Sequence, residues 1–580
     1  MRRTITASKP SIIIPKPLPS TKLILFSALI FLCGCTAGQI GRQKGREFRN
    51  GMIVSAYPDA SEAGISILKK GGNAVDAAIA VQFALAVTLP EAGNIGGGGF
   101  MVYRSAKGEH ATLDFREKAP GRASRNMFLD SAGQVVPDKS LLTHFASGVP
   151  GSVDGMIEAH KRYGKLPWAK LLEPAIKLAG NGFRITKRLA ADLNENAADF
   201  SRLNPGRAVF TGKNLWKEGD KLIQPELENT LKIIAEKGRE GFYAGWVADS
   251  LVAEMQRGGA LISKEDLANY HAVWRKALTG NYRGYTIITM PPPSSGGVAL
   301  LQLLQMMEPW PLSRFGHNTD STVQVMTEAE RRVYADRSKY LGDPDFYKVP
   351  VDSLLRATYQ KNRMSDFSWK KATPSEAVSP GKIAGYESDE TTHFCVVDRE
   401  GNVVAITTTL NGSFGSKIMV GGAGFLLNNE MDDFSIKPGT PNMFGLIGGK
   451  ANAIEPNKRM LSSMTPTIVE KDGQLFLAIG TPGGSTIITS VFQTILNVID
   501  FKMPVQDAVA AKKFHHQWRP DSIFVEQQAI SDRHRKILGE KGYRLIDSPP
   551  IGRTDAITVN PWGYYEGGAD PRGDDTVIGY

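Results

Sequence analysis

The stretch Tyr386–Phe434 decides how the fold of this chain is interpreted. It reads YESDETTHFCVVDREGNVVAITTTLNGSFG over residues 386–415 and, after ten further residues, LLNNEMDDF over 426–434. Two β-branched and apolar runs, Thr392–Val397 and Val403–Leu410, flank the turn-forming sequence DREGN, so a β-hairpin is predicted here. Its first strand follows the acidic run Glu387–Glu390. Thr391 therefore lies at the boundary between a charged segment and a buried strand.

Thr391 has two interpretations. Threonine starts many strands because its β-branched side chain suits extended backbone. Alternatively, Thr391 is a nucleophile, because the α-amino group of the same residue can act as its base once the chain is cut before it. The Thr391 hydroxyl can make that cut by attacking the carbonyl of Glu390, which gives an ester that water opens. This second interpretation makes Glu390–Thr391 the cleavage site.

The motifs around Thr391 resemble those of the γ-glutamyltransferase (γ-glutamyltranspeptidase) family of N-terminal-nucleophile hydrolases. The similar segments are T-T-H-x-x-V, G-N-x-V-A-x-T-x-T-L-N-x-x-F-G and N-N-E-M-D-D-F, with GNIGGGGF at 93–100, DFREKAP at 114–120, LSSM at 461–464 and TPGGS at 481–485. They occur in family order over roughly residues 50–580. Cys395 departs from the Ser or Thr usual at its position, and this departure concerns packing inside the strand.

The resemblance implies an enzyme that cleaves itself into a large fragment, residues 36–390, and a small fragment, residues 391–580, which associate as a heterodimer. The implied reaction transfers the γ-glutamyl group of glutathione, or of another γ-glutamyl amide, to Thr391. Water, an amino acid or a short peptide then accepts that group. No cofactor is implied.

The resemblance also implies a role for each site residue. Thr391 is the nucleophile and Thr409 orients it, while Gly483 and Gly484 hold the oxyanion. The residues that bind the substrate α-carboxylate are Arg116, Ser462 and Ser463. Those that bind its α-amino group are Asn411, Glu430 and Asp433. These residue types suit these tasks, since a guanidinium meets a carboxylate with two parallel N–H groups and adjacent glycines can direct two backbone N–H groups at one oxygen. Without the resemblance, Arg116 would be a solvated strand-end residue and PGGS a turn.

Two other functions stay open at this point. One is an acylase of the same fold that acts on glutaryl amides of the cephalosporin type. Arg116 and the ammonium-binding residues argue against it, because a glutaryl group carries neither an α-amino group nor an α-carboxylate. The other is a surface lipoprotein without activity that only binds a partner. Such a protein would remain a single band on a denaturing gel.

The N-terminal segment predicts export. Five positive residues precede the twelve-residue apolar run Leu23–Gly34, and no acidic residue occurs before Glu47. The run is too short to span a bilayer of about 30 Å, so residues 1–35 are interpreted as a signal peptide. The sequence LCGC ends at Cys35 and resembles a bacterial lipobox in which Cys35 is acylated. The alternative is a simple signal cleaved near Ala37. The expected location is the periplasm, with outer-membrane anchoring if Cys35 is lipidated.

Composition limits the other functions. The net charge of +10 comes from 69 basic and 59 acidic residues, and removal of the five signal positives leaves 64 basic residues, so no nucleic-acid binding is predicted. The glycine-rich GNIGGGGF lacks the Lys-Ser/Thr of a P-loop and leads into a predicted strand, Phe100–Arg104, which disfavours nucleotide binding. His515 and His516 have no third ligand at suitable spacing, so no metal site is expected.

From residue 50 onward, strands are predicted in hairpins and helices in pairs. The other expected elements are strands at Met52–Ala56 and Tyr285–Met290, a hairpin at Thr465–Ile479, helices ending at Gly71 and at Ile499, a buried helix Ala74–Val87 capped by Asn73, and an amphipathic helix Thr322–Tyr340. Asp59 and Glu62 are expected to form a capping box. This order favours stacked sheets covered by helices. The resemblance implies an α+β fold, the αββα four-layer sandwich, as one domain made of two fragments, with the Gly- and Pro-rich segment Pro438–Gly449, including Phe444, as a lid.

Overall fold

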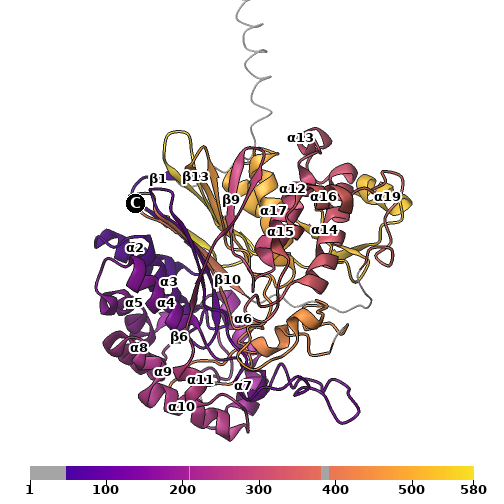
Figure 1. The fold of residues 1–580 in the computed structure, drawn as a ribbon. Coiled ribbons are helices and arrows are strands. Elements are labelled where there is room, and N and C mark those ends of the chain that lie inside the picture. The colour runs from indigo at the N-terminus through magenta and orange to yellow at the C-terminus, as the bar shows by residue number, and fades with distance from the viewer. Residues whose placement is uncertain (1–46, 208, 380–390, 438) are drawn as a thin grey trace, which may run out of the picture. The chain divides into compact units, whose positions relative to one another are not determined.

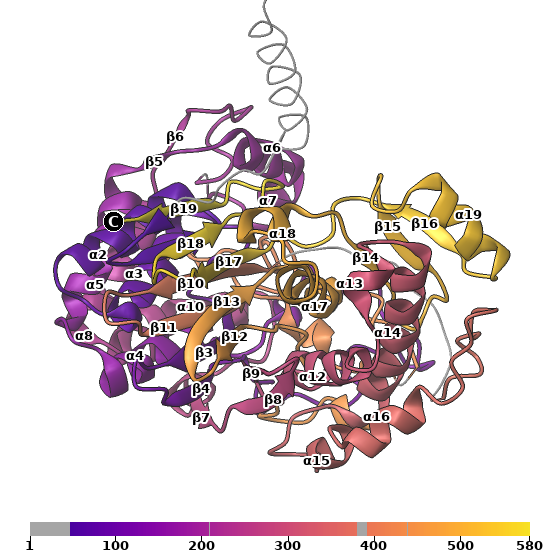
Figure 2. The same ribbon diagram turned by 90° about the horizontal axis from the view of Figure 1, so that it is seen from above.

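The computed structural model describes residues 47–207, 209–379, 391–437 and 439–580, so Cys35 and Glu390 lie outside the described part. Two seven-stranded sheets form its centre (Figures 1 and 2). The first has the order β1 (Glu47–Phe48), β18 (Tyr565–Gly568), β17 (Asp555–Val559), β13 (Gln474–Gly480), β12 (Thr467–Lys471), β9 (Tyr285–Thr289), β8 (Leu278–Tyr282). The second has the order β19 (Thr576–Gly579), β2 (Met52–Ser55), β10 (Thr392–Val397), β11 (Val403–Thr409), β3 (Gly98–Arg104), β4 (His110–Asp114), β7 (Val273–Arg275). All neighbouring strands in both sheets are antiparallel.

The two sheets pack face to face. Successive strand residues point to opposite faces, and the inward-facing residues of both sheets share one buried apolar cluster that includes Val54, Phe100, Cys395, Ile468 and Ile557. Cys395 is therefore a core residue of the sandwich. Burial raises the pKa of its thiol well above the usual value, which keeps the thiol protonated.

Helices cover both outer faces, which confirms the αββα four-layer sandwich. The second sheet is covered by α2 (Pro58–Lys69), α3 (Ala74–Thr88), α4 (Ser152–Tyr163), α5 (Trp168–Asn181) and α8 (Pro225–Lys237). The first sheet is covered by α12 (Gly296–Met307), α14 (Asp320–Tyr340) and α17 (Thr486–Ile499). The described residues form one compact unit.

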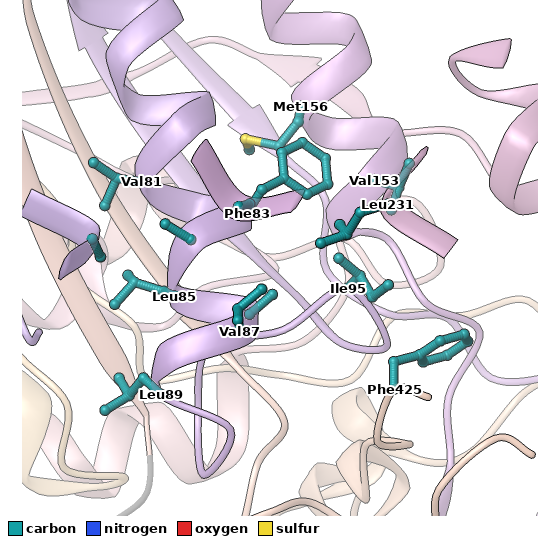
Figure 3. Packing of buried hydrophobic residues seen from close by; sticks show 14 of the residues in the cluster. Val81, Phe83, Leu85, Val87, Leu89, Ile95, Val153, Met156, Leu231 and Phe425 are labelled. Carbon is teal, nitrogen blue, oxygen red and sulfur yellow. The ribbon is translucent and has the colours of Figure 1, made fainter. Parts of the chain in front are cut away.

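Helix α3 shows why the sequence specifies this packing. Asn73 and Asp76 form a reciprocal capping box, and every residue of the helix is buried, as its apolar composition predicts. Figure 3 shows Phe83 of α3 beside Met156 of α4, with Leu85 and Val87 on the adjoining turns. A helix that is apolar on all sides is stable only between other layers, so α3 lies between the second sheet and the outer helices.

The hairpin predicted around Thr391 is present. Strands β10 and β11 pair in register from Thr392 opposite Thr408 to Val397 opposite Val403. The Asp398 carboxylate accepts hydrogen bonds from the backbone N–H groups of Glu400 (2.9 Å) and Asn402 (3.0 Å), which closes the turn. Thr391 directly precedes β10. Because the strands are antiparallel, the start of β10 and the end of β11 lie at the same edge of the sheet.

The strands predicted near residues 52, 100, 285 and 465 are confirmed, as are the helix ends near residues 71 and 499. The capping box at Asp59 is wrong: α2 begins at Pro58 and has no side-chain cap, because proline already has the helical φ and lacks an N–H group that needs a partner. Helix α14 exists but is not amphipathic. It is buried from Thr322 to Arg337, and several of its charges are paired, such as Arg332 Nη1 with Glu328 at 2.6 Å.

Shorter elements complete the described part. They are α6 (Lys187–Glu195), α7 (Ala197–Leu203), α9 (Glu240–Tyr243), α10 (Gly245–Arg257), α11 (Lys264–Ala268), α13 (Leu312–Phe315), α15 (Val351–Leu354), α16 (Ala357–Arg363), α18 (Val505–Ala510), α19 (Asp532–Glu540), β5 (Phe183–Arg184), β6 (Lys221–Leu222), β14 (Phe514–His515), β15 (Ile523–Glu526), β16 (Leu545–Ser548), and the 3₁₀ turns η1 (His144–Ala146), η2 (Glu430–Asp433) and η3 (Lys450–Asn452). Within the described residues, no helix is both long enough and apolar enough to cross a bilayer.

Candidate active site

The predicted site residues come together at one edge of the sandwich. Thr391 at the start of β10 and Thr409 at the end of β11 line the same cavity, although 18 positions separate them in the chain. Strand β4 runs parallel to β11, because both are antiparallel to β3, so Arg116 just beyond β4 reaches the same edge. Asn411, Asp433, Ser462, Ser463 and Gly484 also line this cavity, which we call the glutamyl cavity.

Arg116 is buried and holds two carboxylates. Its Nη1 lies 2.7 Å from Glu430 and its Nη2 lies 2.5 Å from Asp433, and its backbone N–H donates to Asp114 at 3.0 Å. Burial alone would lower the pKa of Arg116, but the two carboxylates outweigh burial and raise it. The strand-end arginine is thus an internal cation and is not solvated.

The carboxyl groups around Arg116 carry shifted pKa values. Burial raises the pKa of Glu430 well above its ordinary range and that of Asp433 less strongly, and in both cases Arg116 opposes the rise. Burial also raises the pKa of the neighbouring Glu117 to about 8. A ligand ammonium would add to the positive charge of Arg116 and further favour the ionised form of these buried carboxyls.

A second buried arginine, Arg337 of α14, lies behind the serines. It donates from Nη2 to Ser463 Oγ at 3.0 Å and from Nε to Ser295 Oγ at 2.9 Å. Within the described residues it has no carboxylate in ion-pair distance, and burial lowers its pKa to about 10. Ser462 Oγ accepts from the Met464 N–H at 3.1 Å. Each serine accepts a hydrogen bond at its oxygen, so its O–H group can still donate a hydrogen bond to an anion in the cavity.

The side chains of Asp432 and Asp433 point in opposite directions, as the sequence suggested. The two residues lie in the 3₁₀ helix η2, however, and not in the alternating strand that was expected. Asp433 faces Arg116 and accepts from Asn442 Nδ2 at 2.9 Å. Asp432 faces away and accepts from Ser140 Oγ (2.7 Å) and from the Met443 N–H (2.8 Å). The segment 439–449 is thus bonded to both aspartates.

That segment lies where the lid was predicted. Phe444 and Leu446 line the glutamyl cavity, and the Phe444 ring packs so closely on Gly484 that a Cβ atom there would come within 2.5 Å of it. Gly484 also has φ of +51° and Gly483 has φ of +136°, values that side-chain-bearing residues rarely adopt. Glycine is therefore required at Gly484 both by conformation and by space.

A polar network holds the glycine turn in place. Ser485 Oγ donates to Gln517 Oε1 at 2.7 Å, and His515 Nε2 lies 2.9 Å from the same oxygen. The Tyr334 hydroxyl donates to the Ser485 carbonyl. These hydrogen bonds fix the N-terminal end of α17. The backbone N–H groups at that end point out of the helix, so they can stabilise a developing oxyanion. His515 thus belongs to a hydrogen-bonded network.

Asn411 and Thr409 are linked. The Asn411 N–H donates to Thr409 Oγ1 at 2.7 Å, while its Nδ2 donates to the Asn429 carbonyl at 3.0 Å. The remaining amide oxygen of Asn411 is the atom suited to accept from an ammonium group. Asn411 has φ of +76°, a conformation that asparagine tolerates better than most residues.

Sequence reasoning found the residues that line the cavity but missed those that support them. Arg337, Gln517 and Asn442 were not predicted, because they do not line the cavity themselves and only hold residues that do. The sequence did contain an indication that Arg337 is buried. Charged residues recur around its helix, whereas an amphipathic helix carries them on one face only.

A threonine directly before an internal strand of an αββα sandwich, lining a cavity together with a glycine turn, is the arrangement of the N-terminal-nucleophile hydrolases. Comparison with known proteins agrees. A family model described as gamma-glutamyltranspeptidase matches residues 60–580. The glutathione hydrolase proenzyme of Escherichia coli is 49% identical over 536 residues, 92% of each chain, and that of Pseudomonas aeruginosa is 47% identical, covering 89% of this chain and 93% of its own.

Solved structures agree as well. A cephalosporin acylase from Bacillus halodurans superposes with a TM-score of 0.83 at 27% identity, covering 94% of this chain and 98% of its own. A chain of Helicobacter pylori gamma-glutamyltranspeptidase superposes with a TM-score of 0.56 at 46% identity, covering 59% of this chain and 97% of its own. The chain described here belongs to the γ-glutamyltranspeptidase family.

Proposed function

We propose that this protein is a self-processing γ-glutamyltransferase and glutathione hydrolase. Thr391 takes the γ-glutamyl group from glutathione or another γ-glutamyl amide and passes it to water, to an amino acid or to a short peptide. The high identity to glutathione hydrolase proenzymes supports the reaction class. The large and small fragments stay associated as a heterodimer, because β10 of the small fragment pairs with β2 of the large fragment inside one sheet.

One observation carries the substrate assignment: the glutamyl cavity contains both charges of a zwitterion receptor. Arg116 lines the cavity and Arg337 is hydrogen-bonded to Ser463 in its wall, so both supply positive charge. Asp433 also lines the cavity, and Glu430 is paired with Arg116, so both supply negative charge. An α-amino acid group presents an ammonium and a carboxylate on one carbon, so it can neutralise both sets. Burying such a group in an uncharged cavity would be costly.

The reaction follows from the position of Thr391. Its hydroxyl attacks the γ-carbonyl carbon, and its α-amino group takes the hydroxyl proton. The N–H groups at Gly483 and Gly484 hold the oxygen as it becomes negative. When the tetrahedral intermediate collapses, the proton passes to the leaving amine and an ester remains on Thr391. Water or an acceptor amine then attacks that ester, and the same α-amino group handles the proton again.

A glutaryl-amide acylase remains the second candidate, since an enzyme named Acylase ACY 1 proenzyme from Pseudomonas is 37% identical over 91% of this chain. Purified wild-type protein should cleave γ-glutamyl-anilide at least about tenfold faster than glutaryl-anilide, because glutaryl lacks the ammonium that Glu430 and Asp433 need. Release of the aniline, measured for both donors at equal concentration, checks this. A preference for glutaryl-anilide would replace the γ-glutamyl assignment with the acylase assignment.

Arg116→Lys should reduce kcat/KM for γ-glutamyl-anilide by about 30- to 150-fold, or roughly 2–3 kcal/mol. Lysine keeps the charge but has one ammonium nitrogen in place of the planar fork whose two nitrogens contact Glu430 and Asp433. Self-cleavage should persist, because it requires the Thr391 hydroxyl and not a bound γ-glutamyl group. Unchanged kcat/KM with correct processing would remove Arg116 from the substrate-binding residues. Arg122→Lys is the matched control, since Arg122 is exposed and bonds only backbone carbonyls within the described residues.

The N-terminal segment supports export to the periplasm, with Cys35 as the lipid-bearing residue that anchors the enzyme in the outer membrane. The support is the positive, acid-free segment followed by an apolar run and LCGC. Labelling of cells with a radioactive fatty acid distinguishes the two forms. Label on the wild-type protein and none on Cys35→Ala is expected, whereas an unlabelled wild-type protein indicates a signal that is only cleaved.

A further inference from the structure

One end of the sandwich carries strand-to-strand turns and lies opposite the glutamyl cavity. Strand β10 begins directly after Thr391, which lines the cavity, and ends at Val397. The strand has six residues, which span about 20 Å. Beyond it, the Asp398 carbonyl accepts a hydrogen bond from the Tyr565 hydroxyl at 3.0 Å, and Tyr565 follows the turn 560–564 between β17 and β18. We call this end the turn edge. It lies a full strand length from the nucleophile.

Trp562 lies on the turn edge and faces solvent. Its side chain is 76% exposed, more than any other large hydrophobic side chain in the described part of the protein. The turn that carries it is well fixed, because the Asn560 side-chain oxygen accepts from the backbone N–H groups of Trp562 (3.0 Å) and Tyr564 (3.0 Å). The Asn560 N–H in turn donates to the Tyr564 carbonyl at 2.9 Å. The backbone therefore holds the Trp562 ring outside the core.

Other rings and two cations surround Trp562. The half-buried ring of Tyr564 has the Arg49 guanidinium 4.8 Å from its centre, and the half-buried ring of Tyr580 has Lys69 Nζ at 5.5 Å. The Arg49 N–H donates to the Tyr580 carbonyl at 3.3 Å, which joins the two pairs. We call Arg49, Lys69, Trp562, Tyr564 and Tyr580 the aromatic patch. A single exposed apolar side chain needs no explanation, but Trp and Tyr rings beside exposed cations are typical of the interface between a membrane and water.

The described chain begins beside the same patch. Strand β1 pairs with β18, with Phe48 opposite Tyr565, and Figure 1 shows β1 and the C-terminal end of the chain at the same end of the sandwich. Eleven residues separate Cys35 from Glu47, and such a stretch spans at most about 40 Å. A lipid on Cys35 would therefore keep the patch near the bilayer. At the high effective concentration that such a tether creates, even a weak contact is occupied.

We propose that the aromatic patch contacts the phospholipid surface of the membrane, with Trp562 at the level of the headgroups and Thr391 facing away from the bilayer. The inference rests on the lipid anchor at Cys35 proposed above. Arg49 and Lys69 can donate hydrogen bonds to lipid phosphates, while the indole ring lies against the adjoining apolar chains. Donors and acceptors then reach the glutamyl cavity from solution, at the edge of the sandwich that is opposite the membrane.

The test uses the purified full-length lipoprotein in vesicles of phosphatidylethanolamine and phosphatidylglycerol. Bromine on the acyl chains of these lipids quenches the fluorescence of a tryptophan that touches them. The chain contains eight tryptophans, and we expect bromine to quench part of the wild-type emission. Trp562→Phe should lose most of that quenching. The matched control is Trp246→Phe, because Trp246 is 43% exposed but lies on α10 in the outer helix layer, and it should be quenched like the wild type.

Donor turnover tests the orientation. Wild type on vesicles should cleave γ-glutamyl-anilide with the same kcat/KM as in detergent, because Thr391 faces solution. Loss of turnover on vesicles alone would overturn the orientation, whereas a wild type inactive in detergent as well would refute the proposed γ-glutamyl function.

Fatty-acid labelling of the same preparation separates the contact from the anchor. A labelled wild type without bromine quenching, or a Trp562→Phe protein quenched as strongly as the wild type, would overturn the membrane contact. A wild type without the label would refute the anchor at Cys35, and the contact with it.

Discussion

Thr391→Ala should leave the protein as a single uncut chain, while wild-type protein separates on a denaturing gel into two fragments. The smaller wild-type fragment should contain 190 residues and begin Thr-Thr-His-Phe. The reason is chemical: the Thr391 hydroxyl is the only group proposed to attack the Glu390 carbonyl, and alanine has none. Donor turnover should be lost as well, since neither the hydroxyl nor the free α-amino group is then present.

Thr392→Ala is the control for this experiment. Thr392 is also buried at the start of β10, and its hydroxyl makes no hydrogen bond to any described residue, so its loss should leave cleavage intact. N-terminal sequencing of the small fragment provides the readout. If Thr391→Ala protein is cut at the same bond, the self-processing mechanism is wrong and another protease makes the two fragments.

Asp433→Asn should reduce kcat/KM for γ-glutamyl-anilide by at least about a hundredfold, or roughly 3 kcal/mol, with processing intact. Asp433 lies 2.5 Å from Arg116 and accepts from Asn442. Asparagine is neutral, so the substrate ammonium and Arg116 lose one of the two carboxylates that face them in a buried site. Most of the effect should appear in KM, because the ammonium is bound in both the ground state and the transition state.

The comparison donor is glutaryl-anilide, which has no ammonium. Asp433→Asn should reduce the ratio of kcat/KM for γ-glutamyl-anilide to kcat/KM for glutaryl-anilide, because only γ-glutamyl-anilide loses an interaction. Asp432→Asn is the matched control: its carboxylate bonds Ser140 and the Met443 N–H on the opposite side, so it should affect the two donors equally. If Asp433→Asn also lowers both rates by the same factor, Asp433 acts on the fold or the lid and not on the ammonium.

The sequence by itself determined the local elements. Runs of β-branched and apolar residues specified β10 and β11, and the apolar composition of residues 74–87 with Asn73 before them specified a buried, capped helix. These outcomes depend on contacts between residues near each other in the chain, so they can be predicted from short segments. The resemblance to a known family then supplied the four-layer order and the site residues, which periodicity alone could not have selected.

Only the tertiary structure decided how charge is distributed in the site. The pairing of Arg116 with Glu430 and Asp433 joins residues more than 300 positions apart, and the opposite directions of Asp432 and Asp433 follow from a 3₁₀ turn where alternation suggested a strand. The hydrogen bonds from Arg337 to Ser295 and Ser463 were not predicted from the sequence either. A buried charge depends on which distant groups surround it, and that is set by the packing of the sheets and not by neighbouring residues.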